Sequence, residues 1–431
     1  MLKLLYANKK NFSKKLIFFL EKRKISQNAN LGSIKKIIRS VKSLGDKSLI
    51  SYEKRFSKIK NKNYKLKFSE KEINYIVRKV DKNLKVSIDI AFNRILNFHS
   101  KQKKNLFKMK DKYRNELSYK YSPIEKIGVY VPGGRASYPS TVLMNCIPAL
   151  VAGVKNIYLT TPCLGKEVNP AVIYAAKKCG VKEILKVGGA HSIAAFAYGT
   201  KTFTKVNKIV GPGNAYVAGA KKEVFGDVGI DMIAGPSEVS VVADKYANAA
   251  WVASDLIAQA EHDIYAQSIL ISSDLNLIKK VNLQLHEQLK YLPKYKIATK
   301  SLKNYGLSIY AKKMSEIADI INEIAPEHLE LFTKNYNKIL PKIKNAGSIF
   351  LGKYSPEAVG DYLAGPNHVL PTSGSSKFSS GLSVYDFLKR HSLIKFTKTG
   401  IERLGSSVIN LSMYEDLEGH ANSVKLRLKK E

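Results

Sequence analysis

The hydrophobic residues of positions 1–120 recur every three or four residues, with basic residues between them. This spacing gathers the apolar side chains on one side of a helix and leaves the charged side chains on the other. The segments LGSIKKIIRSVKSL and KEINYIVRKVDKNLKVSIDIAFNRILNF are typical examples. The pattern predicts amphipathic helices in this part of the chain, which contains few residues that suggest chemistry.

From residue 126 the pattern changes to short apolar runs of strand length that alternate with helical segments. The runs are KIGVYV, NIYLTT, EILKVGGA, NKIVG and IDMIAGPSEVSVVAD. A second series has a helix over 247–262, the strand QSILISS, a helix over 275–289 and the strand GSIFLG. Strands that alternate with helices form parallel sheets, so we predict an α/β fold. After the Gly- and Ser-rich residues 372–381, the tail 382–431 is expected to be a separate small unit.

Composition places the chain among globular proteins with more than one domain. Its 431 residues exceed the size at which a single core stops growing, and 45% of them are hydrophobic. No apolar run is long enough to span a membrane, and the LIFFL stretch near the N-terminus is shorter than the core of a signal peptide. The three cysteines, an odd number without CxxC spacing, argue against disulfides and a cysteine zinc site. We expect a soluble, cytoplasmic protein.

The net charge of +37 would attract nucleic acid or anionic membranes at low salt. The lysines are spread through the first 125 residues and again near 277–345 and 425–430, without an arginine-rich stripe or an aromatic RNA-binding motif. This distribution favours a solvated basic surface, so neither nucleic acid nor membrane is expected as a partner. Selected binding of a polyanion is the alternative.

Four residues could bind a metal ion. Gln259 and His262 lie three apart near the end of a predicted helix and share one face of it. Asp361 follows a glycine in a predicted loop, and His420 lies near the C-terminus. Nitrogen and oxygen ligands without sulfur suit zinc. The alternative is a polar helix face with ordinary structural histidines, because spacing alone does not show that the four residues meet.

Adjacent Glu327 and His328 form a candidate acid/base pair. Pro326 is predicted to open a helix, which would place both residues near its N-terminus. A carboxylate can activate water, and an imidazole can accept and return a proton near neutral pH. The alternative is that Glu327 only complements the helix dipole while His328 is exposed.

Glycine-rich turns form a third group, and each is predicted to follow a strand. At the carboxyl ends of strands, such turns let backbone N–H groups approach a phosphate. No turn has the GxGxxG pattern, so ordinary turn formation is the alternative. The turns are Pro132-Gly133-Gly134-Arg135, Gly188-Gly189-Ala190, Gly211-Pro212-Gly213-Asn214 and Gly235-Pro236-Ser237.

Taken in order, several segments resemble the histidinol dehydrogenase family. They are VPGGRASYPSTVLMN, GPGNAYVAGAKKEVFGDVGIDMIAGPSEV, ASDLIAQAEHD, APEHLEL, NAGSIFLG and GDYLAGPNHVLPTSGSSKFSSGLSVYDFLKR. The resemblance covers nearly the whole chain from about residue 20, and is strongest between residues 126 and 390. It implies oxidation of the amino alcohol L-histidinol to L-histidine through the aldehyde. Two NAD molecules would accept the hydrides, and one zinc ion per subunit would hold the substrate.

The resemblance also implies roles for single residues. The zinc ligands would be Gln259, His262, Asp361 and His420. Glu327 would activate the attacking water, and His328 would be the main proton acceptor. Besides the metal ligands, the substrate-binding residues would be Ser237, His328 and Glu415. The cofactor-binding residues would be Tyr130, His191 and Asn214. Cys146 is expected to be a core residue in a helix, which disfavours a thiohemiacetal mechanism.

One cofactor position departs from the family. The family usually has GGAQAIAA where this chain has GGAHSIAA, so that His191 replaces a cofactor-binding glutamine. An imidazole can donate one hydrogen bond but cannot donate and accept as an amide does. The affinity for NAD, or its dependence on pH, is therefore the property most affected.

The resemblance implies two incomplete Rossmann-like, doubly wound domains with small terminal extensions. The expected boundaries are an extension over 1–22, a first domain from 23–129 and 238–381, an NAD-binding domain over 130–237, and a C-terminal unit over 382–431. In the implied homodimer the C-terminal unit crosses to the partner, and Glu415 and His420 complete its active site. Two alternatives are a zinc hydrolase, which would not need the Tyr130 and Asn214 loops, and a polyanion-binding or structural protein without catalysis.

Overall fold

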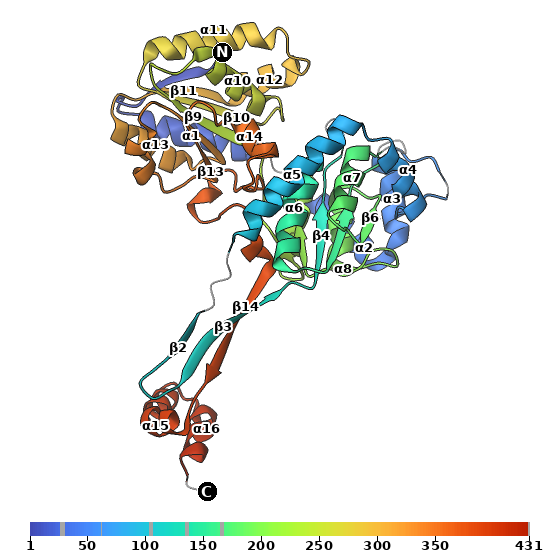
Figure 1. Ribbon diagram of the computed structural model, residues 1–431, viewed down its shortest axis with the longest axis vertical. Coiled ribbons are helices and arrows are strands. Elements are labelled where there is room, and N and C mark those ends of the chain that lie inside the picture. Colours follow the sequence, from blue (N-terminus) through green and yellow to red (C-terminus); the bar gives the residue numbers. More distant parts are fainter. Residues whose placement is uncertain (26–30, 62, 103–106, 134–137, 164–167, 430–431) are drawn as a thin grey trace. The chain divides into compact units, whose positions relative to one another are not determined.

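The computed structural model describes residues 1–25, 31–61, 63–102, 107–133, 138–163 and 168–429. The chain divides into two compact units. The first unit comprises residues 1–101 and 125–386, and the second comprises 102–124 and 387–431. Two parallel sheets belong to the first unit (Figure 1), as the alternation of strands and helices predicted. No helix in the described ranges has both the length and the apolar character needed to cross a membrane.

A five-stranded parallel sheet has the strand order β6-β5-β4-β7-β8. The order reverses between β4 and β7, as in doubly wound folds, and ligands bind at the carboxyl ends of strands at such a point. The strands are β4 (Lys126–Tyr130), β5 (Asn156–Thr160), β6 (Glu183–Leu185), β7 (Lys208–Val210) and β8 (Gly229–Ile230). The connecting helices are α6 (Pro139–Ala152), α7 (Pro170–Lys178), α8 (Gly189–Tyr198) and α9 (Ala215–Val224).

A six-stranded parallel sheet has the order β1-β11-β10-β9-β12-β13, with its reversal between β9 and β12. The strands are β1 (Lys3–Tyr6), β9 (Glu238–Ala243), β10 (Gln267–Ser272), β11 (Gly306–Tyr310), β12 (His328–Phe332) and β13 (Ser348–Leu351). The helices are α10 (Ala249–Ala260), α11 (Leu275–Leu289), α12 (Tyr295–Tyr305), α13 (Met314–Ile324) and α14 (Glu357–Tyr362). Helix α11 has the predicted bounds. Helices α10, α11 and α12 cover one face (Figure 1), because their apolar residues form one core with Val239, Val241 and Leu270.

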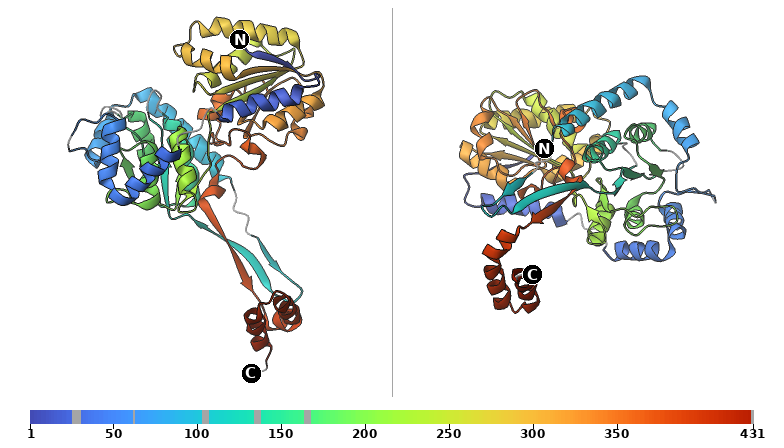
Figure 2. Two further views of the ribbon diagram at one scale, coloured as in Figure 1. Left: turned by 180° about the vertical axis from the view of Figure 1, so that it is seen from behind. Right: turned by 60° about the horizontal axis from the view of Figure 1, so that its bottom comes forward.

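The N-terminal helices are divided between the two sheets. Helix α1 (Phe12–Ile25) packs on the six-stranded sheet with α13, far from it in sequence (Figure 2). The core of the five-stranded sheet instead contains Ile34 and Ile38 of α2 (Leu31–Leu44) and Leu49 of α3 (Asp46–Phe56). Two further helices, α4 (Glu70–Arg78) and α5 (Lys82–Ser100), contact α7 and α6.

This packing differs from the expected grouping of residues 23–129 with 238–381, because the apolar faces of α2 and α3 are buried against the five-stranded sheet. Residues 1–22 are likewise not a separate extension. Strand β1 is the edge strand next to β11, and Leu16 is 2% exposed within the core of the six-stranded sheet.

The second unit is built on a three-stranded antiparallel sheet, ordered β14-β3-β2. Strand β14 (Leu388–Lys395) pairs along its whole length with β3 (Glu116–Pro123), so residues 102–124 join the C-terminal residues in one unit. The prediction of a unit made of 382–431 alone is therefore incomplete. The prediction of amphipathic helices within residues 1–120 is wrong at β2 (Lys108–Lys110) and β3. The sheet is followed by α15 (Lys398–Tyr414) and α16 (Glu418–Leu428), and short 3-10 helices occur at Tyr336–Lys338, Leu340–Lys342, Ser375–Lys377 and Val384–Phe387.

Candidate active site

Glu327 and His328 lie at the beginning of central strand β12. Helix α13 ends at Ile324, and Ala325 adopts the left-handed conformation with φ 49°. Pro326 then follows a helix end, where proline is common because it cannot continue the helix. The prediction that Pro326 opens a helix is therefore wrong. Both side chains are buried, which also contradicts the alternative of an exposed His328.

The two ring nitrogens of His328 differ in their surroundings. Its Nδ1 lies 3.0 Å from the carbonyl oxygen of Glu238, which can only accept, so Nδ1 carries the proton. Its Nε2 is buried and has no hydrogen-bond partner among the described residues. Burial lowers the pKa of His328, although the charge of Asp361 acts in the opposite direction. A neutral ring with a free Nε2 lone pair can accept a proton.

The Glu327 carboxylate, like the His328 ring, bonds to the backbone of Glu238. Its Oε2 accepts the backbone N–H of Glu238 at 2.8 Å and lies 3.7 Å from His328 Nδ1. Burial raises the pKa of Glu327 well above its usual range, and the nearby charges of Glu238 and Asp361 raise it further. A positive charge nearby would favour the carboxylate form, which is the form that can activate water.

The guanidinium group of Arg23, on α1, bonds to Glu238 and to the residues just before it. Its Nη1 lies 2.5 Å from Glu238 Oε1, and both side chains are 3% exposed. The guanidinium also donates to the carbonyl oxygens of Pro236 and Ser237. Ser237 is thus in the turn between β8 and β9. No local signal identifies Arg23, because its partners are more than two hundred residues away.

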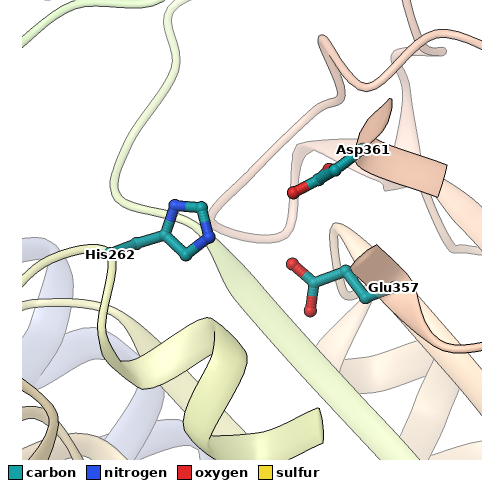
Figure 3. Close-up of side chains that lie close together, drawn as sticks. All are labelled: His262, Glu357 and Asp361. Carbon is teal, nitrogen blue, oxygen red and sulfur yellow. The ribbon is translucent and has the colours of Figure 1, made fainter. Parts of the chain in front are cut away.

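The side chains of His262, Glu357 and Asp361 point toward one another (Figure 3). One donor atom from each lies within 4.8 Å of the others, a spacing that could hold a metal ion. Glu357 and Asp361 are four residues apart on α14 and so share one face of it. The prediction of a loop at Asp361 is wrong. His262 follows the end of α10 on an exposed turn, so it does not share a helix face with Gln259 as predicted.

Gln259 is buried beside this group. In the orientation that satisfies its surroundings, its amide nitrogen donates to Glu357 Oε1 at 2.7 Å. Glu415, the C-cap of α15, and His420 on α16 are exposed residues of the second unit.

The chemistry of these residues fits a divalent cation. Imidazole, amide and carboxylate groups supply the nitrogen and oxygen ligands that zinc accepts. Burial raises the pKa of Glu357 well above its usual range, and the charges of Asp361 and Glu330 raise it further. A cation would relieve this repulsion and keep the carboxylates charged.

A cavity of about 390 Å³ adjoins the group, large enough for a small-molecule substrate. His328, Asp361 and His368 are among the residues that line it. His368 Nδ1 lies 3.0 Å from the carbonyl oxygen of Asp361 and 3.6 Å from Asp361 Oδ1. Sequence reasoning assigned no role to Glu357 or His368. Each is within seven residues of Asp361, and that proximity was the available signal.

Two of the candidate cofactor residues, Tyr130 and Asn214, lie at the carboxyl ends of β4 and β7, where the order of the five-stranded sheet reverses. Tyr130 ends β4, and burial raises the pKa of Tyr130 to about 12. Asn214 caps α9 by accepting the N–H groups of Tyr216 and Val217. Gly134 and Arg135 lie outside the described residues, whereas the rest of the glycine-rich turns can be placed.

Several backbone N–H groups of these turns bond within the protein, among them those of Gly188, Gly189 and Gly211. Gly188 donates to Glu53 Oε1 at 2.9 Å, and Gly189 donates to the Tyr130 hydroxyl at 3.2 Å. Gly211, with φ 112°, donates to Asp231 Oδ2 at 2.7 Å. These three groups are therefore not free for a phosphate, which differs from the expectation for such turns. His191 is buried on the first turn of α8 and also bonds to Glu53.

The chain is similar to known proteins over nearly its whole length. A family model of histidinol dehydrogenase matches residues 20–428. Histidinol dehydrogenase of Pelagibacter ubique is 55% identical over 431 residues, which is 100% of both chains. That of Geobacter metallireducens is 46% identical over 396 residues, 92% of this chain and 91% of the relative. The crystal structure of histidinol dehydrogenase from Elizabethkingia anophelis has a TM-score of 0.92 at 37% identity, and covers 99% of this chain and 98% of that one.

Proposed function

The chain belongs to the histidinol dehydrogenase family, whose members oxidise histidinol in histidine biosynthesis, and we propose that it oxidises L-histidinol fully to L-histidine with zinc and two NAD. The observation that carries this proposal is the arrangement at the start of β12. His328 Nε2 has no hydrogen-bond partner in the described part of the chain, and it lies with the Glu327 carboxylate beside a group of side chains that could hold a metal ion. This combination supplies a proton acceptor, a base for water and a cation site in one place.

Gln259, His262 and Asp361 would hold the zinc ion in this proposal, together with His420, and Glu357 would keep the Gln259 amide oriented. Zinc bound there would hold the imidazole and amino groups of the substrate and so orient its carbinol carbon. Ser237 and Glu415 are the further residues proposed to contact the substrate.

Tyr130, His191 and Asn214 would bind the cofactor at the reversal of the five-stranded sheet. NAD bound there would accept a hydride in each of the two oxidations. The side chains of Tyr130 and His191 both contact the turn formed by Gly188 and Gly189, directly or through Glu53. The cofactor-binding residues would therefore be fixed in position before the cofactor binds.

The chain's own residues would move the protons. His328 would take the hydroxyl proton of histidinol on Nε2 as the hydride leaves the carbinol carbon, which gives the aldehyde. Glu327 would then deprotonate a water molecule, whose oxygen adds to the aldehyde carbon. When the second hydride leaves that carbon, the carboxylic acid of histidine forms, and it releases its remaining proton to water to give the carboxylate. The proposal needs His328 unprotonated before the first oxidation and Glu327 unprotonated before it takes the proton of water, and a bound cation would favour the carboxylate form of Glu327.

The test follows NADH by its absorbance after purified protein is mixed with L-histidinol and NAD. The proposal predicts about two NADH per histidinol, since each of the two oxidations transfers one hydride. Activity should disappear after treatment with a chelator and return with zinc. A zinc-loaded protein that forms no NADH would contradict the proposal and would leave a zinc hydrolase as the alternative.

We further propose a homodimer in which His420 and Glu415 complete the partner's site, since both residues are exposed on the second unit. Mixing an inactive His420→Ala chain with an inactive Glu327→Ala chain tests this arrangement. If sites are shared, each mixed dimer has one site with both defects and one intact site, so random mixing restores about a quarter of the wild-type activity. No recovery in dimers shown to exchange subunits would contradict sharing. The cytoplasmic location stays a prediction.

A further inference from the structure

His191 is joined to an acidic residue from another segment of the chain. It lies on the first turn of α8, two residues after Gly189, and is 2% exposed. Its Nε2 lies 2.9 Å from Oε1 of Glu53, which is fully buried on α3. The imidazole that stands where the family usually has glutamine is therefore one half of a buried pair.

A single oxygen atom of Glu53 connects the ring with the turn. Glu53 Oε1 accepts both the His191 bond and the backbone N–H of Gly188, each at 2.9 Å. Burial acts to raise the pKa of Glu53, but hydrogen bonds from His191, Ser57 and Gly188 lower it below its usual value. Hydrogen bonds to a charged carboxylate are stronger than those between neutral groups.

Two aromatic side chains of α3, the helix that contains Glu53, lie next to the imidazole ring of His191. The ring centroids of Tyr52 and Phe56 lie 5.4 Å and 6.1 Å from that of His191. Tyr52 and Phe56 are four residues apart, so they share a face of α3 and stack on each other. Helix α3 thus fixes both the position and the tilt of the ring, while Tyr130 holds the next N–H group of the turn, that of Gly189.

We propose that Glu53 is a positioning residue of the NAD site, which holds the His191 imidazole and the Gly188–Gly189 turn together as one unit. The proposal rests on the NAD-linked function proposed above. It accounts for the departure at position 191, because the imidazole is placed by Glu53 rather than by the bonds that an amide would make. Glu53 would then affect cofactor binding without touching the histidinol site.

The test measures the dissociation constant of NAD by calorimetry, and the KM values and kcat by NADH formation. Glu53→Ala should weaken NAD binding by about tenfold to a hundredfold, because it removes two hydrogen bonds to a charged group. The kcat at saturating NAD and the KM for histidinol should stay within about threefold of wild type. Glu53→Gln should recover most of the NAD affinity, since its amide oxygen can accept both bonds.

Two further variants separate this role from a general structural one. Lys54→Ala changes the exposed neighbour on α3 and should leave NAD binding unchanged. In a double-mutant cycle, Glu53→Ala in a His191→Ala background should weaken NAD binding much less than it does in wild type, because the two residues act through one contact. Additive effects, or an NAD affinity unchanged in Glu53→Ala, would overturn the proposal. So would equal losses in kcat and in histidinol binding.

Calorimetry also keeps this inference separate from the proposed function. A wild-type protein that binds NAD but forms no NADH from histidinol would contradict the proposed reaction. A weakened binding of NAD by Glu53→Ala would still support the role of Glu53 in that case. A wild-type protein without measurable NAD binding would overturn both proposals.

Discussion

Replacing Arg23 by methionine should destabilise the first unit and disturb its active site together. The substitution removes the guanidinium that lies 2.5 Å from Glu238 Oε1, with both side chains 3% exposed. The buried Glu238 side chain then loses its cationic partner. Its Oε1 keeps the hydrogen bond that the backbone N–H of Ser373 donates at 2.6 Å. Removal of one member of a buried ion pair costs about 3–5 kcal/mol, because the other charge stays desolvated.

A unit of this size has an unfolding entropy of roughly 0.8 kcal/mol/K, so a loss of about 4 kcal/mol corresponds to a fall of about 5 °C in the thermal midpoint. Activity should fall as well, since the backbone of Glu238 bonds to both Glu327 and His328. The double variant Arg23→Met with Glu238→Gln removes both charges and should recover most of the lost stability.

The assay is thermal unfolding followed by circular dichroism, with the midpoints of the two variants compared with wild type. Lys22→Met, an exposed position next to Arg23 on α1, is the matched control and should leave the midpoint unchanged. A midpoint for Arg23→Met within about 1 °C of wild type would refute the reasoning. A double variant no more stable than Arg23→Met would do so as well.

The remaining predictions concern a turn, the thiols and a buried carboxyl. Gly211→Ala should abolish NAD binding measured by calorimetry, because φ is 112° and the new Cβ would lie 2.1 Å from the Tyr130 carbonyl oxygen; an unchanged affinity would be inconsistent with this close contact. Burial raises the pKa of Cys163 to about 12, and all three cysteines are buried, so native protein should resist iodoacetamide at pH 8 by mass spectrometry and keep its activity. Rapid inactivation by labelling would instead point to a reactive thiol. Burial raises the pKa of Asp255 to about 6, so its ionisation opposes folding increasingly as pH rises from 4 to 6. Asp255→Asn should therefore stabilise the metal-free protein by about 1–3 kcal/mol at pH 7 and progressively less toward pH 4, measured by urea unfolding; a pH-independent difference would contradict this assignment.

The local pattern of the sequence was sufficient to predict whether most segments form helices or strands. Alternating strands and helices predicted two parallel sheets, and the helix over 275–289 has the predicted bounds. The strand HLELF was missed, because Pro326 at a predicted helix start and Pro326 after a helix end look alike in sequence. Only the left-handed Ala325 and the pairing of β12 with β9 and β13 distinguish the two cases.

The candidate residues of the site could be named from the sequence, but their contacts could not. The chemistry of a histidine, a carboxylate or an amide belongs to the side chain itself, so Glu327, His328 and Asp361 were recognisable as possible bases and ligands. The pairing of Arg23 with Glu238, and of Glu53 with His191, joins segments far apart in the chain. The periodicity and spacing of residues do not predict such contacts, because the contacts depend on which sheet each N-terminal helix packs against.

The sequence by itself determined the α/β class, the order of most helices and strands, and the residue types available for proton transfer and metal binding. These properties follow from the repeat of apolar residues and from side-chain chemistry, which are local. The tertiary structure alone decided that α1 joins the six-stranded sheet while α2 and α3 join the five-stranded one, and that β3 pairs with β14. It also decided the protonation and orientation of the site, because burial and the charges brought near by folding set both.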